Sequence, residues 1–297
     1  MTPENYTRAP FPYFGGKRSV AALVWERFGR PPQFIEPFCG SAAVLLGAPS
    51  PASLEVIGDQ NFYVANFWRC VKYQPQRTYE WQDYPVSHVD LDARHRWLTH
   101  PERGADLRGK LADPEWPGDP QIAGWWVWGL CAWIGSGWCE REHVGNAGRG
   151  VQSQVPHVGN AGQGVADWFA HLASRLERVR VIHGAWDRTL NHHYGDTETA
   201  VFLDPPYRAF ERLYAAGSNV AVADEVAAWA AEHAHLRVAL CGHRGDYALP
   251  GWEIVEWSRE RMTYGGGGTK DEEAIWFSPA CLRPALAPQR SLFSEVA

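Results

Sequence analysis

The sequence predicts an α/β fold in which a mostly parallel sheet carries helices on both faces. Short apolar runs alternate with segments of helical periodicity along most of the 297 residues, a pattern typical of strands joined by crossover helices. The last two apolar runs, at 252–257 and 273–277, have no helix between them, because four glycines occupy 265–268. We therefore predict that these two strands form an antiparallel pair at one edge of the sheet.

Two β–α units are predicted in the first 75 residues. They consist of a strand at 34–36, a small-residue helix at 42–46, a strand at 54–58 that ends at Asp59, and a helix at 62–71. The alternation resumes after residue 164 with a helix at 167–178, strands at 179–183 and 200–203, a helix at 221–235 and a strand at 237–241. The α/β core is therefore expected to span 1–75 and 165–297.

Residues 76–164 differ from this core, because Pro, Gly, Trp and charged residues replace the regular alternation. Seven of the 16 tryptophans lie between Trp116 and Trp168. One helix is predicted, at 122–134, and a glycine-rich loop follows in which 143–151 recurs as 157–165. We predict an inserted, mainly helical, Trp-rich subdomain.

The formal net charge of -6 counts against a nucleic-acid-binding protein, since binding to phosphates normally leaves a basic signature. Overall charge says little about the local field, however. Only four of the 28 basic residues are lysines, so arginine, which suits phosphates and bases better, dominates the basic residues.

The cysteines, the apolar stretches and the N-terminal residues argue against disulfide-bonded, zinc-binding and membrane proteins. The six cysteines form no C-x-x-C pair, which favours reduced thiols over a disulfide framework. No metal is expected, because the spacings of Cys131, Cys139, His143 and His157 match no standard zinc site. We expect a cytoplasmic protein without membrane association, because no apolar stretch reaches membrane length and no signal-peptide pattern begins the chain.

Two segments predict a ligand site at the carboxyl ends of the strands. In the segment Glu36 to Ser41, Gly40 lets the backbone approach a ligand at the start of a helix, but the segment is not the G-x-G-x-x-G of a dinucleotide site. Asp59 closes the next strand about 20 residues later, where an acidic side chain can accept hydrogen bonds from both ribose hydroxyls. An adenosine-containing ligand is implied, with a helix N-cap as the alternative role of Asp59.

A third segment, Asp204-Pro205-Pro206-Tyr207, follows the apolar strand at 200–203 and predicts methyl transfer to an amino group. The prolines fix a rigid turn in which the Asp204 carboxylate and the Pro205 carbonyl can both accept hydrogen bonds from one planar amino group. Tyr207 offers an aromatic face for a base turned out of a duplex. The alternative is a structural turn with a buried tyrosine.

The order of four motifs resembles that of the Dam-type DNA adenine-N6 methyltransferases. The motifs are Pro12 to Lys17, Phe34 to Ser41, Asp59 to Asn61 and Asp204 to Tyr207. The resemblance implies a Rossmann-like class I methyltransferase fold and S-adenosylmethionine as the cofactor. It implies that Tyr13 and Lys17 line the cofactor pocket and that His183 to Trp186 surround the cofactor's adenine. The resulting cofactor-binding set is Tyr13, Gly15, Gly16, Lys17, Glu36, Pro37, Phe38, Cys39, Gly40, Ser41, Asp59, Gln60, Asn61, Ala185, Trp186 and Asp204.

By the same resemblance, the insertion at 76–164 would be the target-recognition region for double-stranded DNA. We expect DNA contacts from arginines that flank the glycine-rich loop and the catalytic motif: Arg141, Arg149, Arg208 and Arg212. The repeat is either a loop that follows the nucleic-acid backbone or a plain duplication. Trp125, Trp126, Trp128 and Trp133 are interpreted as the core of the subdomain, with entry of Trp133 or Trp138 into DNA as the alternative.

The function predicted from the sequence is site-specific methylation of adenine N6 in DNA with base flipping. We expect a monomer, acting alone or beside a restriction endonuclease, and the Trp-rich middle is similar to phage-encoded relatives. Two alternatives stay open: an amino-methyltransferase acting on cytosine N4, RNA or a protein amide, and a catalytically idle nucleic-acid-binding protein on the same scaffold.

Overall fold

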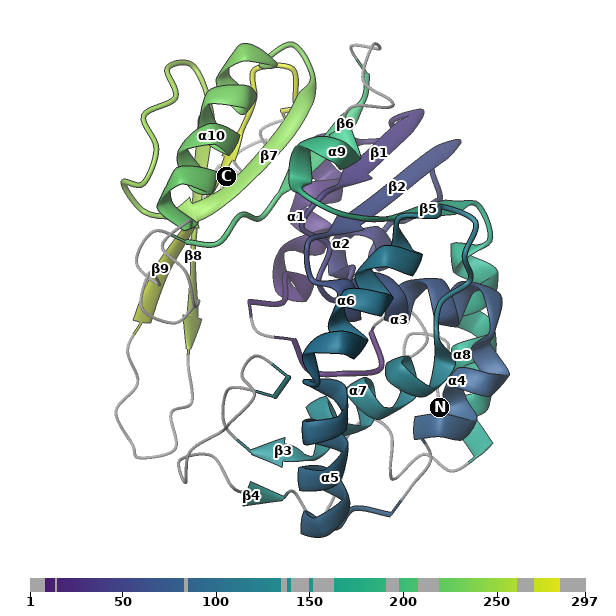
Figure 1. Cartoon of the computed structure of the whole chain (residues 1–297). Helices are drawn as coiled ribbons and strands as arrows, with labels where there is room; N and C mark the ends of the chain where they lie inside the picture. Colours follow the sequence, from purple (N-terminus) through teal and green to yellow (C-terminus); the bar gives the residue numbers. More distant parts are fainter. Residues whose placement is uncertain are drawn as a thin grey trace, which may run out of the picture.

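The computed structural model describes residues 9–13, 15–82, 85–134, 138–139, 150–151, 163–190, 198–207, 219–260 and 270–283. Within these ranges a seven-stranded sheet has the order β5-β2-β1-β6-β7-β9-β8 (Figure 1). Its strands are β1 (Gln33–Glu36), β2 (Leu54–Asp59), β5 (Val179–His183), β6 (Ala200–Leu203), β7 (Arg237–His243), β8 (Glu253–Glu260) and β9 (Lys270–Phe277).

The sheet is parallel from β5 to β7 and antiparallel at the other edge. β1 pairs with β2 and with β6, and β6 pairs with β7, all in parallel. β9 lies between β7 and β8 and is antiparallel to both. The predicted α/β architecture with an antiparallel edge is confirmed. Because β1 lies between β2 and β6, the strand order reverses there, which is where open α/β sheets bind ligands.

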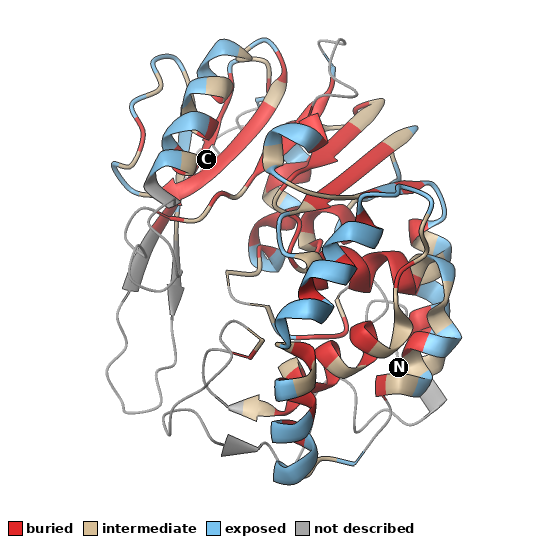
Figure 2. Cartoon of the chain, viewed as in Figure 1, coloured by how far each residue is buried: buried red, intermediate tan, exposed pale blue. Residues whose placement is uncertain are grey.

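Helices cover both faces of this sheet. One face is covered by α9 (Trp186–Leu190) and α10 (Asn219–Glu232), which lie in front of the strands in Figure 1. The other face is covered by α1 (Arg18–Phe28), α2 (Ala43–Leu46), α3 (Phe62–Tyr73) and α8 (Gln163–Leu176). Figure 2 shows the central strands as mostly buried residues, as expected for a sheet between two helical layers.

Alternate residues of each central strand face opposite layers. Val201 and Leu203 of β6 belong to the apolar cluster that includes α10 residues, whereas Ala200 and Phe202 belong to the cluster that includes α1 and α3. Because side chains alternate between the two faces, the position of a polar residue in a strand tells which helical layer it faces.

The middle of the chain contains more helices than the sequence predicted. They are α4 (Pro75–Gln82), α5 (His88–Leu98), α6 (Pro101–Leu111) and α7 (Pro120–Ala132). The predicted helix at 122–134 extends too far, because Trp133–Ile134 form a short strand, β3, that pairs with β4 (Gly150–Val151). The start signals of the unpredicted helices were present: the Ser87 side chain caps α5, and Pro101 occupies the first turn of α6.

The tryptophans of this middle region pack mainly into a shared core. Trp126 and Trp128 are buried, and Trp125 and Trp133 pack partly buried against the same cluster, which agrees with the predicted core. Trp138 is 6 % exposed, and its indole Nε1 donates to the Trp126 carbonyl oxygen at 3.0 Å. Its ring fills the space above Gly129. In this structure, therefore, Trp138 is a core residue.

A buried arginine joins the middle region to the sheet. The Arg69 guanidinium on α3 donates to the carbonyl oxygens of Leu111, Asp113 and Trp116, and also to that of Val181 on β5. α4 packs on α7 and α8, so the middle helices share one continuous core with α3 and α8. The division at 75/76 and 164/165 stays a prediction.

In the part of the chain that the structure describes, no helix is both long enough and apolar enough to cross a membrane.

The packing of Trp138 predicts the effect of its removal. Replacing it by alanine leaves a large cavity beside Gly129, so Trp138→Ala is expected to lower the free energy of unfolding by about 3–5 kcal/mol. Val89→Ala, on the exposed surface of α5, is the control and is expected to stay within about 0.5 kcal/mol of the wild type. Urea denaturation measures both; a wild-type stability for Trp138→Ala would show that the ring is not part of the core.

Candidate active site

The predicted site residues come together at the carboxyl ends of neighbouring strands. Glu36 is the last residue of β1, Asp59 is the last of β2, and Asp204 directly follows β6. Since β1 lies between β2 and β6, these three carboxyl groups flank the position where the strand order reverses.

The N-terminal segment before α1 lies against the loop after β1. The Tyr13 ring covers the Cα of Gly40, so closely that a Cβ at Gly40 would overlap the ring. Gly40 also has φ +44°, a backbone conformation that favours glycine. A Cβ built on Gly16 would contact the Ser41 Oγ. The first two predicted motifs therefore form one surface.

Hydrogen bonds fix the loop at Gly40 from two sides. The Gly40 N–H donates to Asp59 Oδ2 at 2.9 Å, and its carbonyl oxygen accepts from the Trp68 indole at 2.8 Å. Asp59 Oδ1 accepts from the Asn61 N–H at 2.8 Å. The cap of α3 is Asn61, whose side chain accepts from the Tyr63 N–H, so the alternative role of Asp59 as the helix N-cap is wrong. Burial raises the pKa of Asp59 to about 6, although these backbone donors oppose the rise.

A buried ion pair connects the N-terminal segment with the end of β6. Lys17 Nζ lies 2.9 Å from Asp204 Oδ2 and donates to the Gly15 carbonyl oxygen at 2.7 Å. Burial lowers the pKa of Lys17, but Asp204 and other nearby acidic groups outweigh it, so the pKa is raised. Burial also raises the pKa of Asp204, and the Lys17 ammonium opposes this only in part.

Tyr207 lies next to this ion pair and is 8 % exposed. Its hydroxyl donates to Glu273 Oε2 at 3.1 Å, and its ring meets the His243 ring edge-on with centroids 4.7 Å apart. Lys17 Nζ lies 5.1 Å from the centroid of the Tyr207 ring. The ring is thus held by contacts from three separate chain segments.

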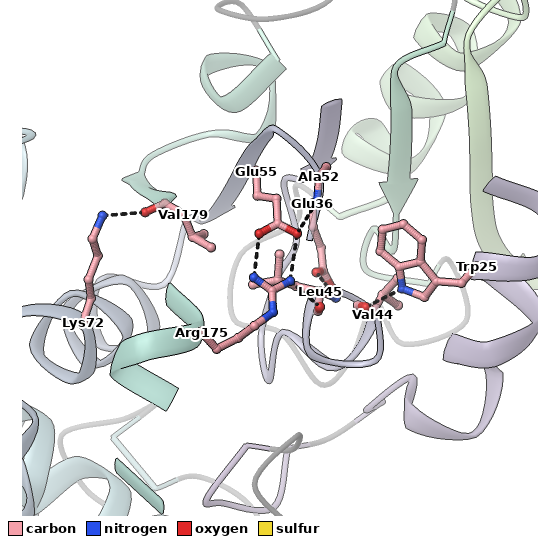
Figure 3. A network of polar contacts seen from close by, with 9 residues as sticks. All are labelled: Trp25, Glu36, Val44, Leu45, Ala52, Glu55, Lys72, Arg175 and Val179. Carbon is pink, nitrogen blue, oxygen red and sulfur yellow. Dashed lines mark hydrogen bonds and ion pairs between the residues drawn. The ribbon is translucent and has the colours of Figure 1, made fainter. Parts of the chain in front are cut away.

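Glu36 lies below the loop rather than on its surface. Its Oε2 accepts from the Leu45 N–H of α2 at 3.1 Å (Figure 3), and the side chain is almost fully buried. Burial raises the pKa of Glu36 to about 8, with smaller contributions from Asp204 and Asp59. Figure 3 also shows Arg175 of α8 in a two-pronged pair with Glu55 of β2, which fixes α8 under the sheet.

The other predicted residues vary in position. Pro37, Cys39 and Pro205 are buried, Phe38, Ser41 and Pro206 are half-buried, and Gln60, Asn61 and Ala185 are exposed. Ala185 and Trp186 follow β5, which is separated from β1 by β2. The Trp186 ring packs edge-on against Trp229 of α10, in the layer opposite α1. Four predicted DNA-contact residues lie outside the described residues: Arg141, Arg149, Arg208 and Arg212.

Sequence reasoning missed two polar contributors to the site, Trp68 and Glu273. Trp68 lies within a predicted helix, but its bond to Gly40 depends on tertiary packing. Glu273 could have been found from the sequence, because in a strand it shares one face with Ile275 and Phe277. A carboxylate on such an apolar face is unusual and indicates a specific role. Among the described residues no group of three or more His, Cys, Asp and Glu side chains is arranged to hold a metal ion.

Residues 13–88 match the model of a family described as D12 class N6 adenine-specific DNA methyltransferase. Over this range the chain is similar to that family. The matched range contains Lys17, Gly40 and Asp59 and ends before Asp204 in the sequence. The methyltransferase resemblance inferred from motif order is confirmed, and with it the enzyme class and a Rossmann-like fold. No curated protein matches the chain at a significant level.

The raised pKa of Glu36 makes the stability of this methyltransferase depend on pH. Between the ordinary value of 4.5 and about 8, the folded protein keeps a proton on Glu36 that the unfolded chain releases. Stability is therefore lost as pH rises through this window, by at most about 1.4 kcal/mol per pH unit.

Glu36→Gln removes this proton while it keeps a hydrogen-bond acceptor for Leu45. The free energy of unfolding of the variant, relative to the wild type, is expected to increase as pH rises from 4.5 to 8 and then to level off. Urea denaturation across this range measures the difference, in which titrating groups that do not interact with Glu36 cancel. A difference that does not change with pH would mean that Glu36 is not held protonated by burial.

Proposed function

We propose that the protein transfers a methyl group from S-adenosylmethionine to the N6 amino group of an adenine at a specific site in double-stranded DNA. The observation that carries the proposal is the Asp204-Pro205-Pro206-Tyr207 turn, which follows β6 beside the buried Lys17. The family match over residues 13–88 supports DNA adenine methylation in general. The cofactor, the turning-out of the base and the site specificity are the proposed refinements.

The residues at the strand ends fit an adenosine that carries a positive charge. Each Asp59 oxygen accepts one backbone N–H, and a carboxylate has lone pairs left for ribose hydroxyls. Asp204 and Glu273 lie beside the Lys17 ammonium, and Asp59 closes β2 at the same end of the sheet, so the surroundings favour a cation. When bound, S-adenosylmethionine supplies an electrophilic methyl group on a positively charged sulfur.

Asp204 and Pro205 would position the amino group of the target base. The Asp204 carboxylate and the Pro205 carbonyl oxygen each accept one of its two N–H groups, which directs the nitrogen lone pair away from the ring plane. Lys17 fixes the carboxylate by its contact with Oδ2. As N6 gains the methyl group it releases one proton, and the raised pKa of Asp204 makes this carboxylate a better acceptor for it.

The remaining roles follow from chemistry and sequence position. Tyr207 would stack on the base after it leaves the duplex, and the middle helices with Arg141 and Arg149 would contact the target DNA. Arg208 and Arg212 would hold phosphates next to the catalytic turn. We further propose that the enzyme works in the cytoplasm as a monomer, alone or with a restriction endonuclease.

The test is transfer of labelled methyl groups to unmethylated DNA. Asp204→Ala is expected to abolish transfer, because N6 loses its carboxylate acceptor, while cofactor binding measured by calorimetry survives. Asp187→Ala, an exposed carboxylate on α9, is the control and should retain full activity.

Two outcomes would contradict the proposal in different ways. Equal transfer by the wild type and Asp204→Ala would remove Asp204 from the mechanism. Label found in N4-methylcytosine or only in RNA, after digestion to nucleosides, would overturn adenine in DNA as the substrate.

A further inference from the structure

Glu273 is a buried carboxylate that belongs to none of the motifs. It lies on β9 and is 4 % exposed. In the strand register it pairs with His243 of β7 on one side and with Trp257 of β8 on the other. Since Ile275 belongs to the apolar cluster that includes α1 residues, the alternation of β9 places Glu273 on the same side of the sheet as Lys17.

One oxygen of Glu273 contacts two residues of the site. Oε2 accepts from the Tyr207 hydroxyl at 3.1 Å and lies 3.9 Å from Lys17 Nζ. Lys17 thus lies between two carboxylates, with Asp204 Oδ2 at 2.9 Å and Glu273 Oε2 at the longer distance.

The burial of this carboxylate needs a reason, because an apolar side chain would fill the same position on the strand at lower cost. If Glu273 were apolar, the Tyr207 hydroxyl would lose the Glu273 carboxylate and keep its hydrogen bond with Asp204, and Lys17 would lose the second of its two carboxylate contacts. The contacts of Glu273 therefore stabilise Lys17 and Tyr207, two residues that each contact Asp204.

We propose that Glu273 is a positioning residue, which holds the Tyr207 ring by its hydroxyl and anchors Lys17 so that the ring and Asp204 meet the target base in a fixed geometry. This inference rests on the proposed function, because it assigns Tyr207 and Asp204 to the target base. It adds to that function a residue from the last described strand, far from both in sequence.

The proposal also predicts a change in proton binding. The charge of Glu273 helps to raise the pKa of Asp204, so its removal lowers that pKa. The titratable groups that face Glu273 come from the N-terminal segment, the turn after β6 and β7; they are Lys17, Asp204, Tyr207, Cys241 and His243.

The first experiment compares methyl transfer by the wild type, Glu273→Gln and Glu273→Leu. Glutamine keeps an acceptor for Tyr207 but removes the charge. The acid limb of the pH–kcat profile of Glu273→Gln should therefore shift to lower pH, because the pKa of Asp204 falls, while kcat at the optimum stays near that of the wild type. Leucine removes both contacts, so kcat should fall by roughly 10- to 100-fold, with KM for S-adenosylmethionine little changed. Glu256→Gln, an exposed carboxylate on β8 paired with Arg244, is the matched control and should change neither.

A double-mutant cycle with Tyr207→Phe keeps the inference separable from the proposed function. If Glu273 holds the Tyr207 hydroxyl, Glu273→Leu should lower the equilibrium constant for folding several-fold less in the Tyr207→Phe background than in the wild type. This stability readout needs no cofactor or DNA. An inactive wild type would overturn the proposed function, and the cycle would still decide whether Glu273 holds Tyr207.

Three results would overturn the inference about Glu273. They are additive effects of Tyr207→Phe and Glu273→Leu on the folding equilibrium, an acid limb of Glu273→Gln identical to that of the wild type, and a loss confined to KM for S-adenosylmethionine. Additive effects would mean that Glu273 does not hold the Tyr207 hydroxyl. An unchanged acid limb would mean that Glu273 is not coupled electrostatically to Asp204, and a loss confined to KM would mean that Glu273 acts on cofactor binding.

Discussion

The site depends most on the buried ion pair between Lys17 and Asp204. Removing two charges from water is expensive, so such a pair persists only where its geometry is good and further hydrogen bonds satisfy both partners. Here the Gly15 carbonyl oxygen and Glu273 complete the surroundings of the ammonium. The pair holds the segment before α1 against the carboxyl end of β6, two parts of the chain that no strand pairing connects.

The position of that segment determines the shape of the cofactor loop. With Lys17 fixed, Tyr13 lies on Gly40, where φ is +44° and no Cβ is present. Asp59 and Trp68 hold the same glycine by its N–H and its carbonyl oxygen. The residues on both sides of the strand-order reversal are thus connected through short polar contacts, and two carboxylates, Asp204 and Glu273, lie beside one ammonium. These carboxylates agree with the proposed positively charged cofactor.

The sequence predicted the parts of the fold that local pattern determines. The strands that end at Glu36, Asp59 and Leu203 were predicted within one residue, because each is a short apolar run followed directly by a polar or turn residue. The antiparallel edge followed from the missing crossover helix. α4, α5 and α6 were missed because each buries only a few side chains, and several of these are polar, such as Thr78, Gln82 and His95.

The same limit applies to the site. Motif order brought Lys17, Gly40, Asp59 and Asp204 to one place in the prediction, and the structure places them together at the strand ends. The partner of Tyr207 was not predicted, since Glu273 lies 66 residues further along the chain and reaches the site only through the pairing of β9 with β7. Sequence motifs identify residues that would contact ligands. The residues that position those motif residues depend on strand order, which the motifs do not reveal.

The most direct test of this account is a double-mutant cycle between Lys17 and Asp204. The free energy of unfolding is measured for the wild type, Lys17→Met, Asp204→Asn and the double variant at one pH. Each single change leaves a buried charge with less compensation and should cost about 3–5 kcal/mol, whereas the double variant should lose clearly less than the sum. Additive losses, within about 0.5 kcal/mol, would contradict the central role of the pair.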